Sequence, residues 1–268
     1  MKSRMKQDWT TMSRLRKPLY VDCSSRASVD RDGPALLVRV PGQADQYFPA
    51  RRLLRVVCRG PVPWSPEALF LCMERSIPVV FTDEDGVVCG VCTGRGNPDD
   101  DLASLLDAVV DREDWRERYD AIQRSVERRV VKVALRRAGL PGNDLRPRHA
   151  RKALRRLRDQ VCGRRASAVL EREAQAMARA LAAQTLLERG LSGSMLRAKH
   201  GPDLEGDLAD ILEFVLEEPT REIARRFGPH PPSRPVLIEA LHRHENAARE
   251  VATTWIHRVE RSLREILV

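Results

Sequence analysis

The chain has 268 residues, of which 42% are hydrophobic and 32% are charged, a balance typical of a folded globular protein and not of a disordered one. Its 47 lysines and arginines against 38 acidic residues give a formal net charge of +9, which favours a polyanionic partner such as nucleic acid. Aromatic residues make up only 4%, so a wall of side chains that stack on bases is not expected.

Residues 1–17 are basic without an apolar run, so they do not resemble a signal peptide. Nowhere does the sequence hold the roughly 18 consecutive apolar residues that a membrane span needs. The expected compartment is therefore the cytoplasm.

Short β-rich runs fill the first hundred residues, and each is closed by glycine or proline. They begin at Pro34, Tyr47, Leu53 and Ile77, and the last returns through the turn Asp83–Gly86 into Val87–Cys92 as a hairpin. Between them, Ser65 and Pro66 predict a helix start, with serine as the cap and proline at the first helical position.

The six cysteines are scattered, and Cys89 and Cys92 form the one C-x-x-C pair. No second pair follows at the spacing of a zinc site, so we expect two thiols of a strand rather than a metal or redox centre.

Glycine, proline and aspartate crowd residues 94–101, which predicts a boundary there. Beyond it, apolar residues recur at three- and four-residue steps. Helices are expected over residues 105–140, 150–189 with an interruption near Gly163, 207–227 with Pro219 as a place to bend, and 236–268. The predicted fold class is α+β, a small N-terminal β-rich domain followed by a larger all-α domain. The expected divisions are a basic tail at 1–17, the β-rich domain at 18–96, a linker at 97–110 and the helical domain at 111–268.

The densest group of candidate catalytic residues follows Lys199. His200 precedes a Gly-Pro turn, and Asp207 and Asp210 lie three residues apart, hence on one face of the predicted helix. Two carboxylates and an imidazole suit a divalent ion that acts on a phosphodiester. The alternative is structural, because aspartates near a helix N-terminus are stabilised by the helix dipole.

A second group is a basic run in which several side chains share one side of a helix, as a phosphate-backbone contact requires. The candidate DNA-binding residues are Arg148, Arg151, Lys152, Arg155, Arg158, Arg164 and Arg165. A solvated helix face with no ligand is the equal alternative.

His242, His244 and Glu245 suggest metal ligands at first sight. Residues two apart on a helix point to different faces, so solvent-facing histidines are expected instead. The sequence has no phosphate-binding glycine loop, no G-x-S-x-G and no H-E-x-x-H, which argues against the commonest nucleotide and hydrolase sites.

Taken in order, these segments resemble the CRISPR-associated spacer-acquisition integrase family, Cas one. The resemblance covers most of residues 18–228. It is carried by the strand Leu53–Gly60, the helix entry Val62–Leu69, the hairpin Glu74–Gly86, the helix Trp115–Leu140, the turn at Gly190-Leu191, His200, and the helix segment Asp207–Glu213.

The resemblance implies that His200, Asp207 and Asp210 hold Mg²⁺ or Mn²⁺. The sequence also departs from the family pattern in two ways. Cys162 stands where the family has its first metal-binding glutamate, with Asp159, Glu171 or Glu173 as substitutes. The segment that follows is missing, and the spacing from His200 to Asp207 is short.

By the same resemblance, the β-rich domain pairs two subunits, and the helical domain joins the 3′-hydroxyl ends of a prespacer to the CRISPR repeat by transesterification. The implied partners are double-stranded DNA and the companion protein Cas two. Two alternatives remain open: a catalytically impaired DNA-binding or scaffold subunit of this family, and a basic helical interaction protein without a DNA role.

Overall fold

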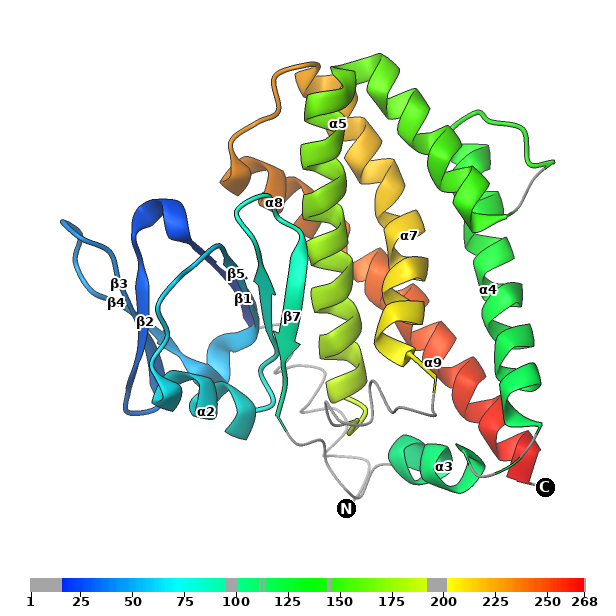
Figure 1. Ribbon diagram of the computed structural model, residues 1–268, viewed down its shortest axis with the longest axis horizontal. Helices are drawn as coiled ribbons and strands as arrows, with labels where there is room; N and C mark the ends of the chain where they lie inside the picture. The colour runs from blue at the N-terminus through cyan, green and yellow to red at the C-terminus, as the bar shows by residue number, and fades with distance from the viewer. Residues whose placement is uncertain are drawn as a thin grey trace. The chain divides into compact units, whose positions relative to one another are not determined.

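The computed structural model describes residues 16–94, 101–110, 112, 114–143, 146–191 and 202–267. The chain divides into two compact units, Met1–Gly96 and Asn97–Val268, which we call the β unit and the helical unit. The first carries every strand of the described residues, and the second is built from helices (Figure 1). The predicted α+β fold class is therefore confirmed. No helix in the described part of the chain is both long and apolar enough to cross a membrane.

The larger sheet of the β unit has four strands in the order β1-β5-β6-β7. They are β1 (Lys17–Asp22), β5 (Leu53–Arg59), β6 (Val79–Thr82) and β7 (Val88–Cys92). β5 is central and pairs in parallel with both β1 and β6, so six of its seven residues are buried. β6 and β7 are antiparallel, which confirms the predicted hairpin, and all six cysteines are free.

The smaller sheet has the order β2-β3-β4, all antiparallel. Its strands are β2 (Ser28–Asp32), β3 (Ala35–Arg39) and β4 (Gln46–Pro49), and two short 3₁₀ helices, η1 (Cys23–Ser25) and η2 (Ala50–Arg52), lie between strands. Helix α2 (Pro66–Glu74) begins as predicted, because the Ser65 hydroxyl accepts a hydrogen bond from the Ala68 N–H at 3.3 Å.

Helix α7 is the central element of the helical unit. The helices are α3 (Asp101–Val110), α4 (Trp115–Arg137), α5 (Pro147–Leu187), α7 (Leu204–Phe227), α8 (Arg234–His242) and α9 (Glu245–Leu267). α7 packs against α4, α5, α8 and α9 (Figure 1), and its buried residues are mostly apolar, with Glu205, Thr220 and Arg221 as the buried polar ones. It runs on through Pro219 to Phe227.

Two segments differ from expectation. Residues 101–110, predicted as part of a linker, form α3, whose Leu102, Leu106 and Val109 are buried in the core of the helical unit. Residues 236–268, predicted as one helix, are divided between α8 and α9. His242 lies exposed at this break, where its Nδ1 is 2.6 Å from an oxygen of the buried Glu245 at the start of α9.

The predicted interruption of α5 is a sharp bend at Gly163. This glycine has a φ of +78° and a ψ of 157°, and helix continues on both sides of it. Only glycine adopts such a backbone without strain. The bend divides α5 into two arms (Figure 1), and it allows Arg158 on the first arm to reach Glu171 on the second.

Candidate functional site

Five carboxylates share one side of α7, and we call them the acidic row. They are spaced three or four residues apart, as side chains on one helix face must be: Asp203, Asp207, Asp210, Glu213 and Glu217. The first of them caps the helix, because the Asp203 carboxylate accepts the Gly206 N–H at 2.9 Å. A Cβ at Gly206 would lie 2.3 Å from that carboxylate, so a larger residue here would require the Asp203 side chain to move.

The carboxylate of Asp207 is held by α4 and, indirectly, by α9. The Tyr119 hydroxyl donates to Asp207 Oδ2 at 2.6 Å, and the Gln123 side-chain amide donates to the Asp207 backbone carbonyl at 3.1 Å. The Trp255 indole N–H in turn donates to the Gln123 side-chain oxygen at 2.9 Å. Burial raises the pKa of Asp207, the Tyr119 hydrogen bond opposes that rise, and neighbouring carboxylates add to it. Three helices thus fix one carboxylate.

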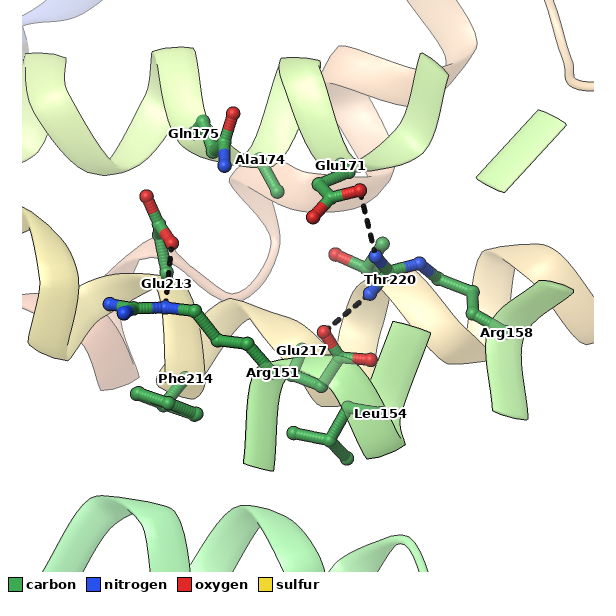
Figure 2. A pocket seen from close by; sticks show the side chains of 10 residues that line it. All are labelled: Arg151, Leu154, Arg158, Glu171, Ala174, Gln175, Glu213, Phe214, Glu217 and Thr220. Atoms are coloured by element: carbon green, nitrogen blue, oxygen red, sulfur yellow. Dashed lines mark hydrogen bonds and ion pairs between the residues drawn. The ribbon is translucent and has the colours of Figure 1, made fainter. Parts of the chain in front are cut away.

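Asp210 and Glu213 share one cation, the guanidinium of Arg151 on α5. Arg151 Nη2 lies 3.0 Å from Asp210 Oδ1, and Arg151 Nε lies 3.4 Å from Glu213 Oε2. The guanidinium also stands 5.0 Å above the ring centre of Phe214, and Figure 2 shows the side chain running between Glu213 and Phe214. Burial raises the pKa of Glu213 to about 7, with Arg151 opposing the rise and Asp210 adding to it.

Glu217, at the far end of the acidic row, binds the buried Arg158. The Arg158 side chain is only 3% exposed, and its guanidinium pairs with Glu217 and, at 3.5 Å, with Glu171. Its Nε also donates to the Ser167 hydroxyl at 3.3 Å. Arg158, Glu171 and Glu217 line a small cavity of about 40 Å³, which is shown in Figure 2. Arg151, Glu213 and five uncharged residues complete its lining, so the wall is partly charged and partly uncharged.

The described residues do not fit a resident divalent ion. Mg²⁺ requires several oxygen ligands at roughly 2.1 Å, but Asp210 and Glu213 already face a guanidinium and Asp207 accepts from a tyrosine. Among the described residues, no group of three or more histidines, cysteines and acids is placed to hold a metal. Asp207 and Asp210 do share a face of α7 as predicted, whereas His200 lies outside the described residues.

The candidates for a first acidic ligand do not complete such a group either. Cys162 is buried, its thiol lies 3.2 Å from the Arg158 carbonyl as a hydrogen-bond donor, and burial raises its pKa, so it is a weak metal ligand. Of the proposed substitutes, Glu171 is paired with arginine as above, and Glu173 is bound by Arg234 of α8 at 2.9 Å. Asp159 is half-buried on the first arm of α5.

The predicted DNA-binding residues divide into two sets. Those exposed at the surface are Arg148, Lys152, Arg155, Arg164 and Arg165. Arg151 and Arg158 instead point to the acidic row of α7. They are seven residues apart, with the buried Leu154 between them, so they belong to the inward face of α5. The prediction that the basic side chains of this run face outward is therefore wrong for Arg151 and Arg158.

An open hollow of about 410 Å³ lies where α4 and α5 approach each other. It is lined by Arg124, Glu127, Arg128, Asn143, Arg146 and Pro147. Arg124 and Arg128 are exposed and one turn apart on α4, a pair that sequence reasoning did not select as DNA contacts. Burial raises the pKa of Glu127, and the charge of Asp210 adds to the rise.

Comparison with solved structures shows which known proteins share this fold. A CAS1 protein from Thermotoga maritima matches with a TM-score of 0.71 at 10% identity, over 92% of this chain and 97% of that one. A casposase bound to its integration product matches with a TM-score of 0.64 at 9% identity, over 93% and 91% of the two chains. The TtCas1–DNA complex matches with a TM-score of 0.56 at 14% identity, over 93% and 91%. At such identities the likeness is one of fold.

No curated protein matches the sequence. The family model for CRISPR associated protein Cas1, however, matches residues 19–183, which is more than half of the chain and spans the β unit and most of α5. The resemblance inferred from the sequence is thereby confirmed, and this chain belongs to the Cas1 family.

Proposed function

We propose that this chain acts in CRISPR adaptation as a Cas1-family subunit whose helical unit binds duplex DNA. Family membership supports the role, and the exposed arginines and lysine of α5 support the binding. The single observation that carries the DNA-binding part is the exposure of these residues together with that of a second pair, Arg124 and Arg128 on α4, which line one hollow with Arg146 and Pro147 at the start of α5. The structural neighbours include one bound to DNA and one bound to an integration product.

The DNA surface consists of two groups. On α5 it includes Arg148 and Lys152, four residues apart and both exposed, and on α4 it includes Arg124 and Arg128, also four apart. Side chains four residues apart lie one above the other on a helix, and rows of this kind match the regular spacing of phosphates. Binding through them is independent of base sequence and weakens steeply with salt.

Fluorescence anisotropy with a labelled duplex, measured over a series of salt concentrations, tests this proposal. The double variant Arg124→Ala/Arg128→Ala is expected to weaken binding to every sequence alike and to reduce the salt slope by about 1–2 units. Arg261→Ala, an exposed arginine of α9, is the matched control. Salt-insensitive binding, or no binding at all, would favour the interaction protein without a DNA role.

A second candidate function is strand joining that depends on Mg²⁺ or Mn²⁺ held by His200, Asp207 and Asp210. The observation that favours it is the placement of Asp207 and Asp210 on one face of α7. The observation against it is the Arg151 ion pair at Asp210, which favours the DNA-binding subunit that does not join strands.

An integration assay separates the two. The purified protein is incubated with a short labelled duplex and a repeat-containing plasmid, with Mn²⁺ or with EDTA. A joined product that needs the metal and disappears in His200→Ala and in Asp210→Asn supports the integrase. DNA binding without product in any metal supports the non-joining subunit.

Two further parts of the proposal rest on the family alone. They are the pairing of two copies through the β unit and assembly with the companion protein Cas2. Light scattering on the purified chain, alone and mixed with the companion, tests both, and a monomer under both conditions would contradict them.

A further inference from the structure

The positive charge at the middle of the acidic row is supplied by the protein itself. Asp210 and Glu213 both face Arg151, at 3.0 and 3.4 Å. The Arg151 Nε and Nη2 atoms are inaccessible to solvent and make no hydrogen bond within the described residues, so the charge at these atoms is compensated by its attraction to the two carboxylates.

The guanidinium of Arg151 is also fixed in position. Carboxylates contact it from α7, and the ring of Phe214, itself buried, lies beneath it (Figure 2). A planar guanidinium that stacks on a ring and binds two carboxylates is held in one orientation. Arg151 is thus held between the carboxylates and the ring, although 35% of its side chain is exposed.

A divalent ion competes for the same atoms. Mg²⁺ and Mn²⁺ bind carboxylate oxygens directly, and Arg151 already faces one oxygen of each carboxylate, Oδ1 of Asp210 and Oε2 of Glu213. A guanidinium this close to both carboxylates opposes the approach of a dication, because like charges a few ångströms apart repel each other and the carboxylate charge is already compensated. The guanidinium and the metal are therefore alternatives.

We propose that Arg151 is the built-in counter-ion of Asp210 and Glu213 and excludes divalent ions from them. A divalent ion binds at this part of α7 only when the guanidinium has left. Without Arg151, Asp210 and Glu213 lose the cation that faces them both, and two uncompensated carboxylates on one helix face attract a divalent ion more strongly than a compensated pair does. This inference follows from the contacts of Arg151 and is independent of whether the chain binds DNA.

The test is a Mn²⁺ titration of the full chain without DNA, in which electron paramagnetic resonance measures free Mn²⁺. The wild-type protein is expected to show no saturable binding below about 1 mM, whereas Arg151→Gln is expected to bind at least roughly tenfold more tightly, since it removes the competing ion pairs. Adding Asp210→Asn to Arg151→Gln is expected to abolish the gain. Arg155→Gln is the matched control, because Arg155 also lies on α5 and pairs with a carboxylate, Glu171, away from Asp210.

Arg151→Met keeps the aliphatic stem above Phe214 and serves as a second variant, with circular dichroism to check folding. Tight saturable Mn²⁺ binding by the wild type that is lost in Asp210→Asn would overturn the proposal, as would a folded Arg151 variant that binds no better than wild type. Unfolding of both variants would also count against it, because a partly exposed counter-ion is dispensable for folding. DNA binding of the wild type, measured separately, leaves each of these results unchanged.

Discussion

Removal of the buried Arg158 is expected to destabilise the helical unit in a pH-dependent way. Arg158→Met keeps most of the side-chain volume but removes the cation that pairs with Glu217 and Glu171. The Glu217 side chain is only 13% exposed, so its charge is left without compensation in a poorly solvated place. Breaking a buried pair by removing one partner costs roughly 3 kcal/mol, which corresponds to a fall in Tm of about 6–12 °C for a unit of this size.

The pH dependence follows from the pKa of Glu217. Burial already raises this pKa, and Arg158 is the largest influence that lowers it, so the variant raises it further. A carboxyl whose pKa is higher in the folded than in the unfolded state stabilises the folded protein at low pH. This contribution to the free energy of unfolding is lost as pH rises through the folded pKa. The loss of stability is therefore expected to be greater at pH 8 than at pH 5.

Urea unfolding followed by circular dichroism at both pH values provides the measurement. Glu217→Gln added to Arg158→Met is expected to recover about half of the loss and most of the pH dependence, because it removes the uncompensated charge. Arg155→Met is the control, since Arg155 is 54% exposed and its pair should contribute less than about 1 kcal/mol. A loss below about 1 kcal/mol that is equal at both pH values would refute the reasoning.

Three other expectations concern the same unit. Tyr119→Phe should cost about 1–2 kcal/mol in urea unfolding at pH 7, because the Asp207 carboxylate loses its O–H donor and its pKa rises further; an unchanged midpoint would contradict the hydrogen bond. The free energy of unfolding should fall by about 2 kcal/mol between pH 4.5 and 7 through Glu213, whose pKa is higher folded than unfolded, and Glu213→Gln should lack this part of the fall. Gly163→Ala should lower the free energy of unfolding by about 1 kcal/mol or more, because alanine is strained at the positive φ of this position. Steric crowding does not contribute, since no atom lies within 4 Å of the added Cβ. A neutral or stabilising effect would show that the bend relaxes.

Much of the fold could be predicted where the signal is local. The Ser65-Pro66 helix start, the β6–β7 hairpin and the interruption at Gly163 each depend on residues adjacent in sequence, and each is present. β1 and β2 were not anticipated individually. β1 pairs in parallel with β5, which is separated from it by the whole of the smaller sheet, and no short-range pattern indicates such a partner.

The site was predictable in part for the same reason. The spacing of Asp207 and Asp210 places both on one face of α7, but it does not reveal what that face meets. Their partners Tyr119 and Arg151 come from other helices, and an arginine in a basic run looks the same whether it faces phosphate or a carboxylate of its own chain. The inward orientation of Arg151 is settled by the packing of α5 against α7, which involves contacts between residues distant in sequence.

The hydrogen-bond chain from Trp255 through Gln123 to Asp207 provides an optical consequence. Trp255 is almost wholly buried, and its indole N–H is tied to the same amide that holds the backbone of Asp207. Indole emission depends on the polarity and hydrogen bonding around the ring. A shift of α7 against α4 and α9 is therefore expected to change the emission of Trp255, one of four tryptophans in the chain, so part of the intrinsic fluorescence of the unlabelled protein should respond to events at this carboxylate.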